Sequence, residues 1–250
     1  MRTIGFSTGA LALGDFRQGL QLLSATGAIA VELSALRDHE LPDLLRALPD
    51  LDLSRYKYVS VHAPSRFSAI TESRVADMLT ALIPRGWPVV VHPDAIADVG
   101  CWKQFGNLLC IENMDKRKPT GRTLRELAPF FETVPEARLC FDIGHARQVD
   151  TTFTVGREIL RVLGDRLLQV HLSELDGNCH HEPISMATVH AVREVAHWIK
   201  PVPVILESRV ARDRIADELR VAALCFETAR TAPSVEGPRA RDASSPLPAR

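Results

Sequence analysis

Residues that can bind a metal ion or move a proton stand at the ends of short apolar runs along this sequence. Seven of eight such runs end in, or directly before, one of the following residues: Glu32, His62, His92, Glu112, Asp142, His171 and Glu207. The first run instead ends at Ser7 and Thr8. A lone glutamate or histidine beside a strand is usually solvated or hydrogen-bonded in the core. An ionisable residue at the same position, the end of the run, in seven successive runs indicates a shared site. Desolvated charges need partners, and a divalent cation supplies one.

The residue types restrict the metal. Carboxylate and imidazole together suit zinc, manganese, cobalt or iron, whereas calcium and magnesium draw mainly oxygen ligands. We therefore expect a divalent metal, with zinc or manganese first and cobalt or iron also compatible. Two more groups could extend the site: His145 stands three residues after Asp142, and Cys179 and His181 stand close together in the segment after His171. Histidines in such a loop are more often exposed than metal-bound.

The elements that must position these residues follow from the runs themselves. The runs span 3–7, 29–33, 58–62, 88–92, 108–112, 138–142, 167–171 and 202–207, and each is almost continuously apolar. Strands buried on both faces, as in parallel sheets covered by helices, have this composition. Amphipathic helices are expected between them, at 16–25, 72–83, 122–131, 155–163 and 188–199.

Eight strand and helix repeats predict an α/β fold, a single (β/α)8 TIM barrel with parallel strands and an outer ring of helices. An open doubly wound sheet would use the same alternation, but no glycine-rich phosphate turn follows the first strand. In a barrel the carboxyl ends of all strands meet at one mouth. The seven ionisable residues are therefore expected to form one cluster there.

Composition and charge restrict the expected partners, cellular location, cysteine state and domain organisation. The 250 residues carry a formal net charge of only -1, so no overall field favours nucleic acid or an anionic membrane. No signal-peptide pattern opens the sequence and no apolar run reaches the roughly 18 residues of a membrane span, so we expect a cytoplasmic protein. The five cysteines show no CxxC pairing, which predicts free thiols. We predict a catalytic domain over 1–230 and a disordered tail rich in Pro, Ser and Arg over 231–250.

Short motifs surround the strand-end residues in a characteristic order. They are His62-Ala63-Pro64, His92-Pro93, Glu112-Asn113, Asp142-Ile143-Gly144-His145, His171-Leu172-Ser173-Glu174, His181 and Glu207. This succession resembles the xylose-isomerase-like barrel superfamily of sugar isomerases, epimerases and endonuclease IV. The resemblance covers nearly the whole barrel and implies the fold more closely than the reaction, because one scaffold hosts several chemistries.

Within that superfamily, the ketose 3-epimerase branch implies a metal tetrad of Glu112, Asp142, His171 and Glu207. There the two glutamates also act as acid and base on opposite faces of the substrate. The chemistry agrees, because carboxylates on either side of a metal-stabilised enediolate can remove and return a proton. We expect these residues to bind the substrate: Glu32, Asn113, His145, Glu174 and Arg209. The branch also has an acidic residue near Lys118 and an arginine near Gly177, where this sequence departs from it.

The endonuclease IV side resembles the sequence differently. There His62 and His92 match ligands of an additional metal, and His145 and His181 match ligands of a third, so one to three metals per chain are expected. Cys179 stands where that pattern has an aspartate, and its thiolate could also bind zinc. The near-neutral charge offers few of the phosphate contacts that dominate DNA affinity. Nucleic acid is therefore not the expected partner.

The leading hypothesis is a divalent-metal-dependent isomerase or epimerase acting on a sugar, sugar phosphate or related polyhydroxy compound, with Glu112 and Glu207 as proton-transfer groups. The alternative is an endonuclease IV-like phosphodiesterase acting on abasic DNA. Minor alternatives are a multinuclear iron enzyme and a non-catalytic sugar-binding barrel. The run Lys116, Arg117 and Lys118, with Arg209, could hold an anionic group, although a solvated charge run is the simpler interpretation. The partner is a small carbohydrate, and a homo-oligomer is compatible with the sequence.

Overall fold

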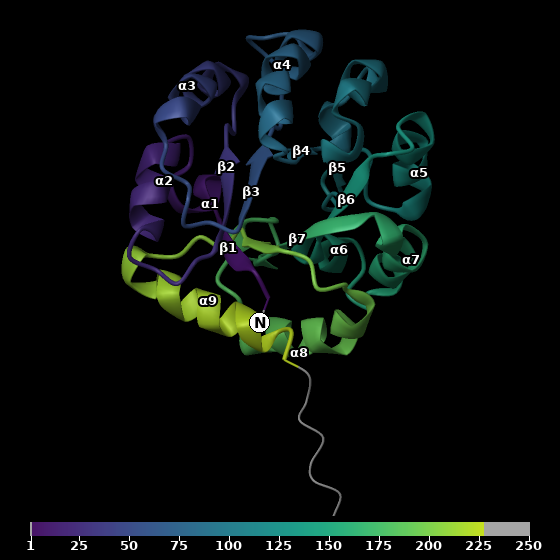
Figure 1. Ribbon diagram of the computed structural model, residues 1–250. Coiled ribbons are helices and arrows are strands. Elements are labelled where there is room, and N and C mark those ends of the chain that lie inside the picture. Colours follow the sequence, from purple (N-terminus) through teal and green to yellow (C-terminus); the bar gives the residue numbers. More distant parts are fainter. Residues whose placement is uncertain (1, 228–250) are drawn as a thin grey trace, which may run out of the picture.

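Eight parallel strands close into a barrel in the computed structural model, which describes residues 2–227 (Figure 1). The strands are β1 (Ile4–Ser7), β2 (Ala30–Ser34), β3 (Tyr58–His62), β4 (Val89–Val91), β5 (Leu109–Glu112), β6 (Arg138–Asp142), β7 (Leu167–Leu172) and β10 (Val204–Leu206). Their order around the barrel is β1-β10-β7-β6-β5-β4-β3-β2. The predicted (β/α)8 barrel is confirmed.

Helices surround the barrel, as Figure 1 shows. They are α1 (Thr8–Ala12), α2 (Phe16–Leu23), α3 (Leu41–Ala47), α4 (Glu72–Leu79), α5 (Leu124–Thr133), α6 (Ile143–Val149), α7 (Thr154–Leu163), α8 (Met186–Val195) and α9 (Ile215–Leu224). Side chains that accept a backbone N–H begin several of them, including Asp15, Thr71 and Ser185. The five helices expected from amphipathic spacing are all present, with ends shifted by a few residues. The connection from β4 to β5 contains only short 3-10 helices.

The main hydrophobic core lies between the strands and the helices, where outward-facing side chains such as Val61, Ile111 and Leu139 are completely buried. The inside of the barrel is different. It contains a small apolar group of Val90, Cys110 and Cys140, together with a series of buried polar side chains. These are Glu32, Ser60, Gln169 and His171.

The strand register divides the barrel interior into layers. Ser34 of β2 pairs with His62 of β3, whereas Glu32 pairs with Ser60. Since side chains alternate between the two faces of a strand, Glu32 lies one layer below the His62 level. Gln169 likewise stands two residues before His171 on β7 and pairs with Cys140 of β6. The mouth therefore rests on a second polar layer inside the barrel.

A two-stranded antiparallel sheet extends the segment after β7. Its strands are β8 (Glu174–Leu175) and β9 (His181–Glu182). The last described helix, α9, ends at Leu224 and contacts β1, a few residues before the predicted domain boundary. The predicted tail, 231–250, lies outside the described residues. All five cysteines are free thiols, as predicted, and none of the helices within 2–227 has the length and apolar character to cross a membrane.

Asp38 fixes the loop that follows β3. Its carboxylate is buried and accepts hydrogen bonds from the backbone N–H groups of Ser68, Ala69 and Ile70, all within 2.9 Å. Burial alone would raise the pKa of Asp38, but these backbone donors outweigh it and lower the pKa to about 2. The loop is thus held against the β2–α3 connection by one ionised side chain.

Replacing Asp38 by Asn should make stability depend on pH in a defined way. The folded-state pKa is depressed, so the stabilisation by ionised Asp38 is complete above the ordinary aspartate pKa of 3.8 and is lost as the pH falls towards about 2. Melting temperatures of wild type and Asp38→Asn should therefore differ at pH 6, and the difference should shrink as the pH falls from 3.8 towards about 2. Replacement of the exposed Asp213 by Asn is the control and should follow the wild type. A constant difference across this range would contradict the assignment.

Candidate metal centre

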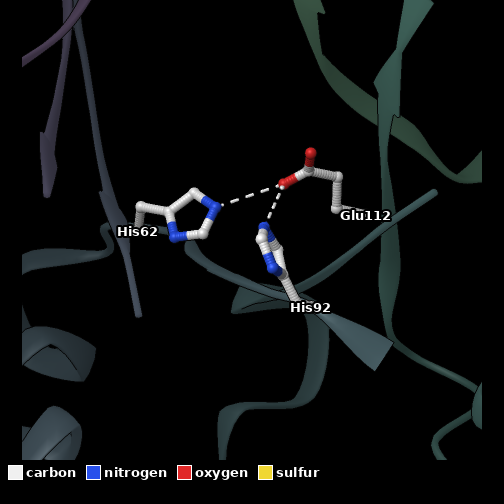
Figure 2. Close-up of side chains that lie close together, drawn as sticks. All are labelled: His62, His92 and Glu112. Atoms are coloured by element: carbon white, nitrogen blue, oxygen red, sulfur yellow. Dashed lines mark hydrogen bonds and ion pairs between the residues drawn. The ribbon is translucent and has the colours of Figure 1, made fainter. Parts of the chain in front are cut away.

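The carboxylate of Glu112 lies at the centre of the barrel mouth. Its Oε2 atom is 3.2 Å from Nε2 of His62 and 3.5 Å from Nε2 of His92, as Figure 2 shows. The two imidazole rings meet edge to face, with centroids 4.8 Å apart. The ends of β3, β4 and β5 place these three side chains together, because the strands are neighbours in the barrel. Their ligand atoms lie within 4.8 Å of one another.

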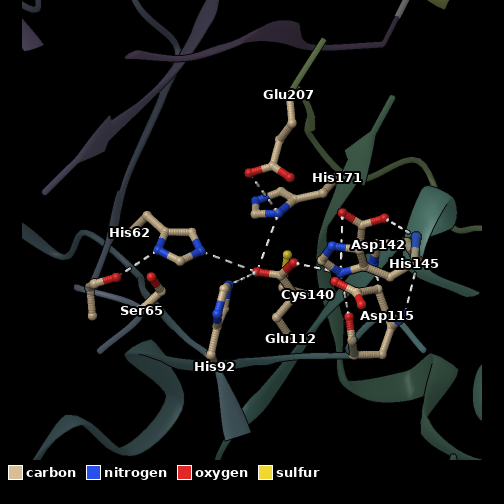
Figure 3. A network of polar contacts seen from close by, with 12 residues as sticks. His62, Ser65, His92, Glu112, Asp115, Cys140, Asp142, His145, His171 and Glu207 are labelled. Carbon is tan, nitrogen blue, oxygen red and sulfur yellow. Dashed lines mark hydrogen bonds and ion pairs between the residues drawn. The ribbon is translucent and has the colours of Figure 1, made fainter. Parts of the chain in front are cut away.

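A second group shares Glu112 and extends towards β10. It consists of Glu112, Asp142, His171 and Glu207, whose ligand atoms also lie within 4.8 Å of one another (Figure 3). Nδ1 of His171 is 3.4 Å from Oε2 of Glu112 and 3.6 Å from Oε1 of Glu207. The tetrad predicted from the sequence is thus brought to one place by four strands. One carboxylate connects it to the His62 and His92 pair.

Each of three imidazoles presents one ring nitrogen to Glu112 and turns the other to an oxygen atom behind it. Nδ1 of His62 lies 2.7 Å from the main-chain oxygen of Ala63. Nε2 of His171 lies 3.2 Å from both carboxylate oxygens of Glu32. The outer partner of His92 is more distant, with Nδ1 3.9 Å from Oδ1 of Asp94. Such outer partners set the tautomer and the orientation of metal-binding histidines.

The charges of the cluster favour a cation. Glu112 Oε1, Asp142 Oδ2 and His171 Nδ1 are buried without a hydrogen-bond partner, which is costly for polar atoms. Burial, together with the nearby Glu207 and Glu112 carboxylates, outweighs His145 and raises the pKa of Asp142 to about 6. Burial and the repulsion from Glu112 likewise raise the pKa of Glu207, although His171 acts to lower it. A divalent cation would satisfy the orphaned atoms and compensate the repulsion, so the donor set fits a metal.

Three residues predicted for a third metal do not join either group. Nδ1 of His145 hydrogen-bonds the main-chain oxygen of Asn113 at 2.9 Å, and Nδ1 of His181 lies 2.8 Å from Oγ of Ser173. Cys179 directs its thiol towards Gln148, with Sγ 3.8 Å from Oε1. Across residues 2–227, every group of ligand atoms close enough to hold a metal excludes these three. His145 nevertheless adjoins the centre, with Nδ1 3.2 Å from Glu112.

The predicted substrate-binding residues take up different places. Asn113 exchanges two hydrogen bonds with the backbone of Asp142 and so connects the ends of β5 and β6. Glu174 accepts hydrogen bonds from Ser185 N and the Thr188 hydroxyl at the start of α8. These contacts favour supporting roles for both residues. Arg209 is exposed at the mouth.

Glu32 is completely buried in the layer below the mouth, where it also accepts hydrogen bonds from Ser60 and Gln169. Its contact with Nε2 of His171 indicates a role in orienting that imidazole, and its carboxylate also lies within 4.8 Å of ligand atoms of His62 and Glu207. Sequence reasoning missed Gln169 and Asp94. The alternation of side chains along β7 could have indicated Gln169, two residues before His171. Asp94 lies in a loop, where no such period applies.

Similar folds occur among solved structures of several enzymes. D-psicose 3-epimerase from Clostridium cellulolyticum, solved with D-tagatose, matches with a TM-score of 0.62 and 13% identity, covering 91% of this chain and all of that one. The TM-score is 0.57 for endonuclease IV from Thermus thermophilus, with 21% identity over 90% of this chain and 99% of that one. This protein shares the barrel fold of these enzymes. The fold that the strand-end motifs implied is therefore confirmed.

This shared barrel fold leaves the reaction open. The probable 3-DHS dehydratase AsbF from Bacillus anthracis is also similar, with a TM-score of 0.56 and 13% identity over 89% of this chain and 99% of that one. No protein-family model matches the sequence, and no curated protein matches it in sequence. Function must therefore be argued from the site itself.

Replacing Glu112 by Gln should remove metal binding at both groups, because they share this carboxylate. Titration calorimetry with Zn²⁺ and Mn²⁺ should show a loss larger than the roughly 10- to 100-fold that follows removal of an outer partner. Replacement of the exposed Glu158 on α7 by Gln is the matched control and should bind metal as the wild type does. Metal binding that survives Glu112→Gln unchanged would place the metal elsewhere.

Replacing Glu32 by Gln should weaken metal binding by about 10- to 100-fold, because His171 loses the carboxylate that orients it. The same calorimetric titration measures this change. Circular dichroism of the metal-free variant should show an intact fold. An unaltered affinity would show that Glu32 does not support His171.

Proposed function

We propose that this protein is a divalent-metal-dependent isomerase or epimerase acting on a sugar, sugar phosphate or related polyhydroxy compound. One observation carries the proposal. Glu112 and Glu207 approach the same ring nitrogen of His171 from β5 and β10, two strands that are separated by β6 and β7 in the barrel order. Two carboxylates thus converge on one centre from different directions, which is the arrangement needed to move a proton from one face of a substrate to the other.

The two carboxylates differ in access. The side chain of Glu207 is 15% exposed, whereas that of Glu112 is 1% exposed. Glu207 is therefore the group that most readily meets a substrate entering the mouth, and Glu112 does so only from within the centre. Glu112, Asp142, His171 and Glu207 would hold the metal, with zinc or manganese as the best match to this donor set. When bound, a divalent metal polarises a carbonyl and an adjacent hydroxyl group and stabilises the enediolate charge.

The pair of His62 and His92 favours one second candidate. A simple tetrad does not need these imidazoles, yet both face Glu112, so a second metal has ligands ready. Two metals that share a carboxylate suit attack on a phosphodiester. An endonuclease IV-like activity on abasic DNA is accordingly the alternative, and the number of bound metals bears on the choice.

Elemental analysis of protein purified without added metal should give one metal per chain if only the tetrad is filled. Two metals per chain would bring in His62 and His92. The ratio in Glu112→Gln should fall in either case, because the tetrad and the His62 and His92 group lose their shared ligand. Metal-free wild type after purification and reloading would contradict the proposal that this is a metal enzyme.

Replacing Glu207 by Gln should lower turnover by roughly 10²- to 10⁴-fold, the usual contribution of a positioned acid or base. The assay follows incorporation of solvent deuterium at carbon, by NMR, for a panel of ketoses and their phosphates with Mn²⁺ or Zn²⁺. Glu158→Gln should exchange deuterium at the wild-type rate. Full exchange activity in Glu207→Gln would contradict this role, and cleavage of an abasic oligonucleotide without any exchange would favour the nuclease.

A further inference from the structure

A large pocket opens beside the metal centre. Its volume is about 1290 Å³, and its walls come from the loops that follow β2, β3, β4, β5 and β10. Asp94, in its wall, approaches His92, which in turn faces Glu112. The pocket therefore adjoins the His92 side of the centre through Asp94. Ser65, three residues after His62, also lines it (Figure 3).

Three arginines line this pocket without an ion pair. They are Arg37, Arg66 and Arg209, which follow β2, β3 and β10. All three are exposed, and among the described residues 2–227 none of them pairs with a carboxylate. Three guanidinium groups from separate loops thus border one space. Only Arg209 was expected from the sequence to serve the mouth.

The cations that the sequence suggested for this purpose are largely engaged within the protein. Arg117 makes two side-chain hydrogen bonds to Asp115 and one to the main-chain oxygen of Asn178. Lys118 forms an ion pair of 2.8 Å with Asp94. These contacts hold the loop after β5 in place. The free positive charge at the mouth comes instead from the three arginines.

The acidic residues of the pocket do not cancel that charge. Asp94 is paired with Lys118. Glu72 accepts hydrogen bonds from the backbone N–H groups of Ala97 and Asp98 and from Trp102 Nε1. Since Lys118 balances Asp94, three arginines remain against the single negative charge of Glu72, and the pocket lining carries a surplus of positive charge. A concave surface focuses such a field on an entering anion.

The pocket wall also has an apolar part and a fixed shape. Leu36, Phe67 and Ile70 contribute apolar surface. The loop that carries Arg66 and Phe67 is held just beyond them by the hydrogen bonds of Asp38 to Ser68 and Ile70. A preorganised wall lowers the cost of ordering the site on binding.

We propose that Arg37, Arg66 and Arg209 bind the anionic group of the substrate, a phosphate or a carboxylate, while its polyhydroxy part reaches the metal centre. Arginine suits this purpose, because its planar fork matches both anions in two parallel hydrogen bonds. The inference rests on the proposed function and narrows its substrate class to phosphorylated or carboxylated sugars. A small anion is favoured over DNA, because the overall charge is only -1.

The test compares D-fructose 6-phosphate with D-fructose by titration calorimetry on metal-free protein at low ionic strength. Wild type should bind the phosphate at least about tenfold more tightly than the neutral sugar. The triple variant Arg37→Gln, Arg66→Gln, Arg209→Gln should lose this preference, and Arg161→Gln, an exposed arginine of α7 outside the pocket, should keep it. Melting temperatures and circular dichroism establish that the triple variant is folded. Titration with D-gluconate tests in the same way whether the pocket binds a carboxylate.

Three outcomes would overturn the proposal. They are equal binding of the two fructose compounds by wild type, unchanged preference in the triple variant, and phosphate binding that appears only after metal is added. Tighter, salt-dependent binding of an abasic duplex that the same triple variant abolishes would assign the arginines to nucleic acid instead. Metal-free binding does not involve proton transfer, so these results are independent of the deuterium-exchange assay. Loss of exchange with intact phosphate selectivity would reject the isomerase alone.

Discussion

Acidic side chains crowded at a water-excluded barrel mouth are the constraint on which the rest of this structure depends. Glu112, Asp142 and Glu207 converge there above the completely buried Glu32. Carboxylates at such distances in a desolvated space repel one another, and their ionisation requires compensating positive charge. Imidazoles supply part of it, and the atoms that they leave without partners mark where a cation would complete the balance.

The barrel accommodates this cluster because the apolar core that stabilises the fold and the polar residues of the site lie on opposite faces of the strands. Most apolar burial occurs outside the strands, between the sheet and the helices. The interior can therefore contain a polar layer, in which Ser60 and Gln169 each donate a hydrogen bond to Glu32 beneath His171. A buried polar network of this kind is favourable only when its members are satisfied, and it then holds its side chains in one geometry. The orientation of His171 follows from this layer.

The same fold serves an epimerase, an endonuclease and a probable dehydratase among the similar structures. Reaction type therefore depends on what each chain adds to the mouth. Here the additions are two imidazoles facing a shared glutamate and a cationic pocket next to them. The imidazoles are extra ligands that could bind a second metal. The arginines of the pocket would favour an anionic substrate.

The sequence alone determined the barrel and the core of the candidate site. Seven apolar runs ended in or beside ionisable residues, and the parallel topology places all such ends at one mouth, so these residues could be grouped from the sequence. The resemblance to the ketose 3-epimerase branch singled out Glu112, Asp142, His171 and Glu207 among them, and their ligand atoms do lie together. Only the tertiary structure decided which atoms face each other. Glu32 lies one layer below His62, because β2 continues to Ser34 and the register pairs Ser34 with His62, and its carboxylate contacts His171. The arginines of the pocket stand on loops, whose paths depend on packing between distant segments and have no period that a sequence pattern could reveal.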